Sequence, residues 1–196
     1  YLSRYLQAKR TDVTEIEAAK AQLESLLSSG RIVIQDRYYT VEDLDAIIRG
    51  EVRKPQEVGA VFFDYIQKMK AGRTFTSTVD RLGYISSTLL EVAITTDLPL
   101  ILGAQFNREA PGVAGAAGPG KGRPSLEYLK GSGDLEQDAN VVLSVYNEAR
   151  EKVGTGAGTD QELEICALKN RDGGVNAITK LMLYAKLNKV EDIGAW

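Results

Sequence analysis

Three sets of polar side chains stand at the ends of apolar segments, where a folded chain could present them for chemistry. Asp64 ends the apolar run 59–63, Gln105 ends the run 98–104, and Lys169 and Arg171 precede the glycine-rich turn 172–174. A carboxylate in such a place can hold the magnesium of a bound nucleotide, commonly through water. An amide both donates and accepts hydrogen bonds, so Gln105 could contact a γ-phosphate or orient an attacking water. Two cations could reach the phosphate of a neighbouring subunit, as an arginine finger does.

Each of these residues also has a plainer interpretation. Asp64 could cap a following helix, Gln105 could be one of the polar residues that end most strands, and the two cations could form an exposed hairpin tip. The first two residues follow successive predicted strands separated by one helix. Because α/β sheets bind ligands at the carboxyl ends of parallel strands, this arrangement favours a functional site at Asp64 and Gln105.

One segment is similar to a phosphate-binding loop but does not complete its pattern. Gly115, Gly120 and Lys121 satisfy the first seven positions of G-x-x-x-x-G-K-[ST], and Gly122 stands where a magnesium-binding hydroxyl is required. Pro124 follows almost at once, so no helix start is available to bind phosphate. We therefore interpret residues 109–123, which are rich in glycine, alanine and proline, as a flexible loop.

Hydrophobic periodicity predicts the elements that would position these residues. We expect helices at 14–28, 40–49 and 77–96. A Thr14–Glu17 capping pair opens the first, and the second begins at a Thr40–Asp43 cap-like pair and is ended by Gly50. We expect strands at 31–35, 59–64, 98–105, 140–146, 162–168 and 177–184, the last three joined as hairpins. The runs 59–64 and 98–105 are typical of strands buried on both faces of a parallel sheet. The predicted fold is a single α/β domain, with a mainly parallel sheet flanked by helices and antiparallel hairpin strands at its C-terminal end.

Composition narrows the classes of protein and of site. The chain has 196 residues, 43% of them hydrophobic, and carries a net charge of −3. This charge argues against a surface that coats nucleic acid through bulk positive charge, but leaves binding by a short loop open. The absence of histidine excludes a histidine metal site and a Ser-His-Asp triad. The apolar runs are too short to cross a bilayer, so we expect no membrane contact and a cytoplasmic location.

Four segments, taken in order, resemble one family, the DnaB-type replicative DNA helicases. VFFDYIQKM (61–69) is similar to their Walker B segment, an aliphatic run followed by D-Y-L-Q-L-M, and LPLILGAQFNR (98–108) is similar to their S-Q-L-N-R segment. RPSLEYLKGSGDLEQDANVVLSVY (123–146) resembles R-P-x-L-x-D-L-R-E-S-G-x-I-E-Q-D-A-D-V-V, and ALKNRDGG (167–174) resembles the K-x-R-x-G hairpin. The E-Q-D-A segment is the most specific of them.

The resemblance implies a RecA-like motor domain in a ring-shaped homo-hexamer, with ATP and Mg²⁺ bound between subunits. By matching positions, Asp64 would hold Mg²⁺ through water and Gln105 would sense the γ-phosphate. Lys169 and Arg171 would act in trans on the nucleotide of the neighbouring subunit. The family also implies a primase and a helicase loader as partners.

The resemblance further implies a loop that grips single-stranded DNA in the channel of the ring. Here that loop is residues 129–133, with Lys130, Gly131 and Gly133 as the candidate DNA-binding residues. Backbone N–H groups would face the phosphates, and glycines allow such a close approach. Lys130 and Gly131 stand where the family has Arg and Glu, and the glycine-rich segment 111–122 is an insertion, so we expect a divergent or phage-like member.

The family's phosphate-binding loop and its water-polarising glutamate would lie upstream of Tyr1, where residues 1–10 already have the spacing of a helix in progress. We therefore expect the chain by itself neither to hydrolyse ATP nor to unwind DNA, and the parent protein to do both. Two alternatives stay open. The parent could be a RecA-like ATPase of another class, or the chain could be a regulatory or binding subunit without a phosphate-binding loop.

Overall fold

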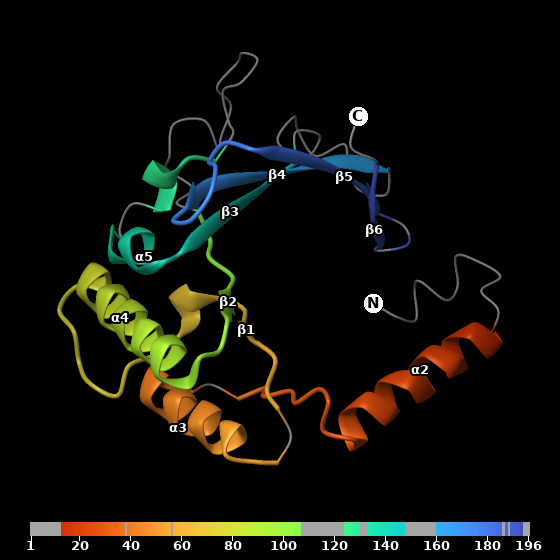
Figure 1. Ribbon diagram of the computed structural model, residues 1–196, viewed down its shortest axis with the longest axis horizontal. Coiled ribbons are helices and arrows are strands. Elements are labelled where there is room, and N and C mark those ends of the chain that lie inside the picture. Colours follow the sequence, from red (N-terminus) through yellow and green to blue (C-terminus); the bar gives the residue numbers. More distant parts are fainter. Residues whose placement is uncertain are drawn as a thin grey trace.

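The computed structural model describes residues 13–37, 39–55, 57–106, 124–129, 133–147, 160–185, 187 and 189–193. Within this part of the chain, two sheets and their helices form the fold (Figure 1). A pair of parallel strands packs with α3 (Val41–Val52) and α4 (Thr78–Thr96), and a four-stranded antiparallel sheet follows α5 (Gly133–Asp138). Helix α2 (Val13–Ser28) lies apart from both, and none of its described side chains is buried.

Strands β1 (Val61–Phe63) and β2 (Leu100–Leu102) form the parallel pair, with Phe62 opposite Ile101. The connection between them contains the 3-10 helix η1 (Ile66–Lys68) and the long helix α4 (Thr78–Thr96). Parallel neighbours need such a crossover, because a short turn cannot return the chain to the same end of the sheet. The crossover brings the ends of β1 and β2 side by side.

The helices begin and end at residues suited to those places. At α3 (Val41–Val52), Thr40 and Asp43 form a complete capping box, as the sequence predicts. At α4, the Ser77 hydroxyl accepts a hydrogen bond from Val79 N–H, and Asp97 ends the helix in the left-handed region with φ of 55°. Asp is one of the few residues other than glycine that enters this region readily.

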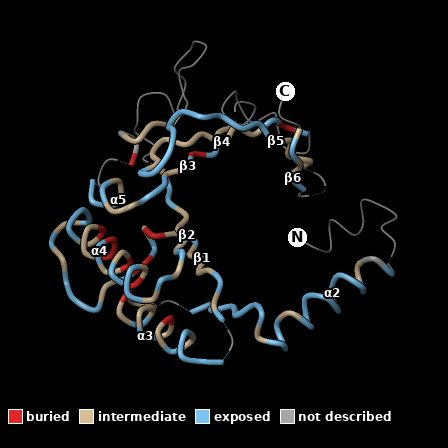
Figure 2. Tube along the Cα trace, in the orientation of Figure 1, coloured by how far each residue is buried: buried red, intermediate tan, exposed pale blue. Residues whose placement is uncertain are grey.

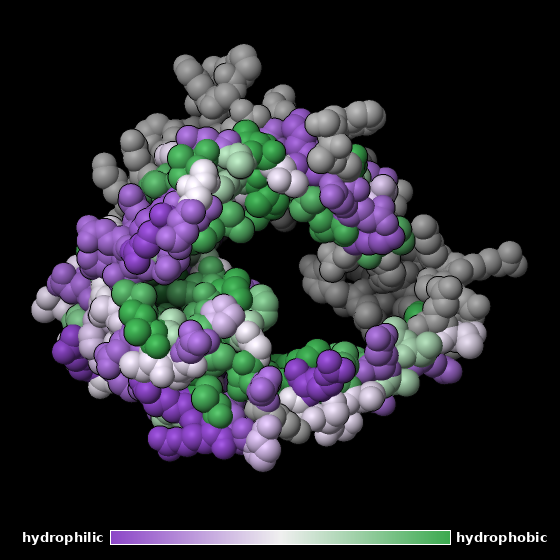
Figure 3. Space-filling view, viewed as in Figure 1, coloured by the Kyte–Doolittle hydropathy of each residue, from purple (hydrophilic) through white to green (hydrophobic). Residues whose placement is uncertain are grey.

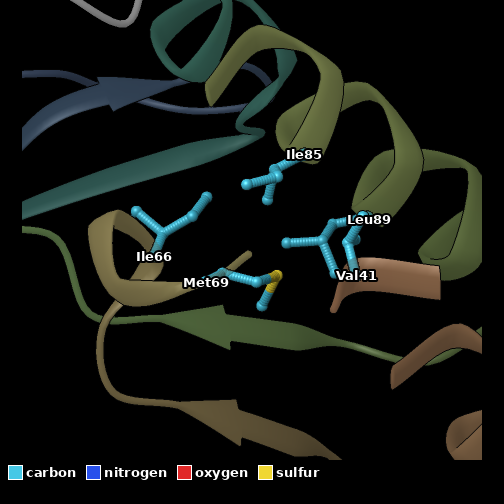
Figure 4. Close-up of a cluster of buried hydrophobic side chains, with 5 residues drawn as sticks. All are labelled: Val41, Ile66, Met69, Ile85 and Leu89. Carbon is cyan, nitrogen blue, oxygen red and sulfur yellow. The ribbon is translucent and has the colours of Figure 1, made fainter. Parts of the chain in front are cut away.

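The core lies where α3 and α4 meet η1. Val41, Ile66, Met69, Ile85 and Leu89 are at most 2% exposed and form one cluster (Figure 4). On α4 the buried residues are Leu82, Ile85, Ser86, Leu89 and Val92, a spacing that places them on one helix face. Figure 2 shows the buried stretches of α3, α4 and η1 converging on this region. The turn that follows β1 is therefore anchored by Ile66 and Met69.

The antiparallel sheet has the order β3-β4-β5-β6. Its strands are β3 (Val141–Tyr146), β4 (Gln161–Asn170), β5 (Ile178–Tyr184) and β6 (Lys189–Asp192). Before β3 come η2 (Leu126–Leu129) and the short helix α5 (Gly133–Asp138), which packs on α4. Ser86 donates a 2.6 Å hydrogen bond to Asp138 at this contact. Beside it, a Cβ on Gly83 would meet the Asp134 carboxylate, so the glycine leaves room for that side chain between the two helices.

The parallel strands are not buried on both faces, and in this the sequence prediction is wrong. Phe63, Leu100 and Leu102 pack against the core, whereas Phe62 is 75% exposed and Ile101 is 44% exposed. No described element covers that second face. Val141, Leu143 and Val145 of β3 are also exposed. The space-filling view of Figure 3 shows hydrophobic surface around the opening between the two sheets and α2.

Most expected elements are present, with differences at their boundaries. Residues 31–35 do not form a strand: Gly30 adopts φ of 72° and Ile32 N–H bonds to Leu26 O, so this backbone closes the end of α2 instead. Gly50 lies inside α3, which continues to Val52, and Thr14 lies inside α2 rather than capping it. Strand β6 was not expected. Residues 1–10 and 109–123 lie outside the described residues.

Candidate nucleotide-binding site

Asp64 and Gln105 lie together, as the sequence predicts from their positions after successive strands. Asp64 follows β1 directly, and Gln105 lies three residues beyond the end of β2. Both line one open hollow of about 320 Å³, whose other lining residues are Tyr65, Gly103 and Ala104. The hollow is at the carboxyl ends of the parallel strands, where α/β sheets bind their ligands.

Gly103 sets the floor of this hollow. Its N–H donates to Phe63 O at 2.8 Å and its carbonyl accepts from Ile66 N–H at 2.9 Å. The segments that follow β1 and β2 therefore stay paired past the ends of these strands. A Cβ on Gly103 would lie 3.1 Å from Asp64 Oδ1, a contact tighter than side chains usually make. Glycine at this position therefore leaves room for the carboxylate above the backbone.

The Asp64 carboxylate fits a magnesium ligand of the water-mediated kind. It is exposed, it faces the hollow, and within the described residues it has no hydrogen-bond or ion-pair partner that would hold it away. No group of three or more acidic, cysteine or histidine ligands occurs in the described part of the chain. Mg²⁺ suits this arrangement, because it keeps several waters and binds through one or two carboxylates plus substrate phosphates.

Gln67 ties the end of β2 to the turn that follows Asp64. Its side-chain Nε2 donates to Gln105 O at 3.0 Å, and its Oε1 accepts from Gln105 N–H at 3.1 Å. The two residues are 38 positions apart in sequence. The turn itself is anchored from α4, where the Arg81 guanidinium donates to Met69 O and to Gln67 O, the latter at 3.4 Å. Gln67, Gly103 and Arg81 were not among the residues singled out from the sequence. Two signals were available: Gln67 matches the glutamine of the D-Y-L-Q-L-M pattern, and a glycine at a strand end can mark a close backbone approach.

A second network holds the loop between η1 and α4. Glu42 accepts hydrogen bonds from Tyr84 Oη at 2.8 Å and from Gly72 N–H at 2.9 Å. Arg73 stacks on the Tyr84 ring, 3.8 Å from its centroid. Burial acts to raise the pKa of Glu42, but the hydrogen bonds from its own backbone, Tyr84 and Gly72 outweigh it and lower the pKa. The same hydrogen bond raises the pKa of Tyr84, because the neutral phenol is the donor.

Lys169 and Arg171 contact α5 rather than the hollow. Lys169 Nζ donates to the carbonyls of Glu136 and Gln137, the latter at 3.0 Å, and Arg171 Nη2 donates to Gln137 O at 3.1 Å. Strand β4 ends at Asn170, so Arg171 stands just beyond it, yet both cations reach the same carbonyl. Cations are favourable at the carbonyl end of a helix. These two side chains are therefore not part of the Asp64–Gln105 hollow in a single chain.

Only part of the predicted DNA loop, residues 129–133, lies within the described residues. Lys130 and Gly131 lie outside the described residues. Gly133 is the first residue of α5, and apart from its chain neighbours and the backbone of its own helix, no described atom lies within 4 Å of the position that its Cβ would take. Packing inside the described chain therefore does not require glycine at 133.

Comparison with known proteins identifies the class. The profile of the family "DnaB-like helicase C terminal domain" matches residues 3–192, so the chain belongs to that family. The replicative DNA helicase DnaB of Leifsonia xyli is 32% identical over 135 residues, which cover 67% of this chain and 28% of the relative. DnaB of Helicobacter pylori (strain ATCC 700392 / 26695) is 25% identical over 185 residues, which cover 78% of this chain and 37% of the relative. The chain thus spans about a third of the length of these relatives.

Two solved structures confirm the α/β, RecA-like fold. One, described as a DnaB-like replicative helicase and its interactions with primase, matches with a TM-score of 0.75 at 23% identity, over 95% of this chain and 43% of that chain. The other, described as an ATPase domain, matches with a TM-score of 0.67 at 23% identity, over 79% of this chain and 52% of that chain. Among the described helices, none combines the length and the apolar character that a bilayer crossing requires.

Proposed function

We propose that this chain is part of the motor of an ATP-driven replicative DNA helicase, and that the hollow at Asp64 and Gln105 faces the phosphates of ATP. The observation that carries the proposal is that these two residues line one hollow at the ends of adjacent parallel strands, in a chain of the DnaB-like family. Family membership favours this function over a RecA-like ATPase of another class and over a regulatory subunit.

In this proposal Asp64, Gln105 and Gly103 have different tasks. Mg²⁺ would neutralise charge on the β- and γ-phosphates, and Asp64 would hold its water shell in place. Gln105 would donate a hydrogen bond to the γ-phosphate or orient the attacking water through its amide. The glycine floor at Gly103 lets the carboxylate lie close to the backbone, so that the phosphates can approach both groups.

The other assigned residues would act between subunits and on DNA. In a ring of six copies, Lys169 and Arg171 would reach the nucleotide of the neighbouring subunit, which requires them to leave or share the carbonyls of α5. Lys130, Gly131 and Gly133 would contact the phosphates of single-stranded DNA. We also propose a bacterial or phage-infected cytoplasm as the location, and a primase and a helicase loader as partners.

The test compares Asp64→Asn with Asp97→Asn in the protein as its gene encodes it. Both variants replace a carboxylate by an amide at an exposed position, and asparagine tolerates the left-handed backbone at 97. We expect Asp64→Asn to lower magnesium-dependent ATP turnover by about a hundredfold or more. A bound metal ion stabilises the charge that develops in the transition state by several kcal/mol. Asp97→Asn should remain within about twofold of wild type, as a surface substitution of this kind usually does.

Strand separation is measured in parallel on a forked DNA substrate. Wild type should unwind it with ATP and Mg²⁺, and Asp64→Asn should not. Normal ATP turnover by Asp64→Asn would refute the magnesium assignment. ATP turnover by wild type without any unwinding would instead favour a RecA-like ATPase of another class.

A further inference from the structure

We propose that Gln67 is a positioning residue that holds Gln105 beside Asp64, and that it does so through its side-chain amide. This inference rests on the proposed function, because the task of Gln105 is assigned there. Gln67 does not line the hollow. It acts on the backbone of the residue that does.

The two hydrogen bonds of the contact extend the backbone pairing of the parallel strands to Gln105. Backbone pairing between the segments that follow β1 and β2 ends with the hydrogen bonds of Gly103, two residues before Gln105. Beyond that point, the Gln67 amide replaces a neighbouring strand: it donates to Gln105 O at 3.0 Å and accepts from Gln105 N–H at 3.1 Å. A neutral carboxamide carries a donor and an acceptor side by side, which is what both backbone groups of one residue require.

Gln67 is itself held on both sides. It lies between Ile66 and Met69, which are 0% and 1% exposed, and the turn is closed by a 3.0 Å hydrogen bond from Met69 N–H to Ile66 O. Arg81 on α4 donates to Gln67 O and Met69 O. A side chain that projects from so constrained a turn can fix another segment, since little of its backbone is free to follow a displacement.

The consequence is a link between the two proposed nucleotide contacts. Asp64 stands three residues before Gln67 on the same turn, and Gln105 is attached to that turn by two hydrogen bonds. Without them, the exposed end of β2 would keep only the pairing at Gly103. The Gln105 side chain would then sample positions away from the γ-phosphate while the magnesium ligand stayed in place. Loss of Gln67 should therefore slow the chemical step more than it weakens nucleotide binding.

The test is a double-mutant cycle on steady-state ATP turnover in the protein as its gene encodes it. Gln67→Met keeps the length of the side chain and removes both hydrogen bonds, and it is combined with Gln105→Ala. Gln22→Met is the control, because Gln22 is exposed on α2 and distant in sequence from the hollow. We expect Gln105→Ala to lower kcat by about a hundredfold or more, as loss of one donor to a developing charge does. Gln67→Met should lower kcat by about ten- to hundredfold, since a misplacement of about 1 Å can cost that much.

The decisive readout is the combination of the two substitutions. If Gln67 acts through Gln105, the double variant should match Gln105→Ala within about threefold, whereas independent effects would multiply. The KM for MgATP should change by less than about threefold in Gln67→Met, because only the positioning of the chemical step is altered. Gln67→Asn, which stays polar but is too short to make both bonds, should repeat the fall in kcat.

The outcomes separate the inference from the function on which it rests. A raised KM with unchanged kcat, an unchanged kcat in both Gln67 variants, or multiplying effects would overturn the positioning role while leaving the role of Gln105 intact. An unchanged kcat in Gln105→Ala would overturn both. Thermal unfolding midpoints are measured for every variant. A fall in kcat accompanied by an equal fall for Gln22→Met would show a general loss of the fold and would also overturn the inference.

Discussion

Replacement of Glu42 by alanine should destabilise the chain by about 2 kcal/mol. The structure gives this carboxylate two hydrogen bonds, from Tyr84 Oη and from Gly72 N–H, which tie α3 to α4 and to the loop between η1 and α4. A hydrogen bond to a charged group contributes about 1.5–3 kcal/mol, and both of these are partly open to solvent, so we take the lower part of that range. A further few tenths of a kcal/mol come from its place in the first turn of α3.

Glu51→Ala on the same helix is the matched control. Glu51 pairs with Lys54 at 2.6 Å, an i,i+3 contact at the surface, so its loss should cost no more than about 0.5 kcal/mol. Urea unfolding of the chain, followed by circular dichroism, gives the free energy of unfolding for both variants. Equal destabilisation by the two substitutions would refute the view that the Glu42 network holds the loop.

The stability that Glu42 contributes should also depend on pH in a stated direction. Its pKa is lowered in the folded chain, because the hydrogen bonds outweigh burial. The contribution is therefore fully present above the unfolded value of about 4.3, and is lost as pH falls through the folded pKa. The difference in urea midpoint between wild type and Glu42→Ala should shrink as the pH is lowered from about 6 to about 3. A difference that stays constant over this interval would show that charge is not its basis.

Three further substitutions test the core and the assigned sites. Ile85→Ala should lower the free energy of unfolding, measured in urea, by about 3 kcal/mol, because Ile85 is 0% exposed. Ile94→Ala on the same helix is the control: Ile94 is 71% exposed, so its loss should cost less than about 1 kcal/mol. Equal costs would contradict the assigned core. Gly133→Val should leave the free energy of unfolding within about 0.5 kcal/mol of wild type, since its Cβ meets no described atom outside its own helix and chain neighbours. It should weaken single-stranded DNA binding in a fluorescence anisotropy titration more than it weakens ATP binding. Unchanged DNA affinity would remove Gly133 from the DNA loop. Arg171→Ala should lower ATP turnover by about a thousandfold while size-exclusion chromatography shows the assembly intact, because the one described hydrogen bond of its side chain is to Gln137 O. Normal turnover would reject the finger role.

The helices and strands with strong local signals were predictable from sequence. Thr40 and Asp43 are three residues apart before an apolar stripe, and the structure shows the capping box that this spacing implies. The strand predicted at 31–35 was wrong because strand propensity is not sufficient: Ile32, Val33 and Ile34 find no partner strand among the described residues, and Gly30 turns their backbone against the end of α2. The exposure of Phe62 was equally invisible, because an apolar run does not say whether both of its faces are covered.

The positions of Asp64 and Gln105 were predictable for a topological reason. Two parallel strands joined by one crossover helix must end at the same edge of their sheet, so polar residues that follow them lie close together whatever the details of packing. The contacts of Lys169 and Arg171 were not predictable in the same way. Their partners are backbone carbonyls of Glu136 and Gln137, and backbone groups leave no trace in the choice of residue at those positions.

The contact that Gln67 makes could not be predicted from the sequence. Its position three residues after Asp64 is plain from the sequence, but its partner is the backbone of a residue 38 positions later. That contact exists because α4, 19 residues long, returns the chain beside β1 with Phe63 opposite Leu102, which leaves Gln105 level with the η1 turn. A shift of one residue in this register would present a different backbone unit to the amide and turn the side chains of β2 to the opposite face. The strand ends therefore select which residues can meet a nucleotide, while the register set by α4 selects which side chain can hold them there.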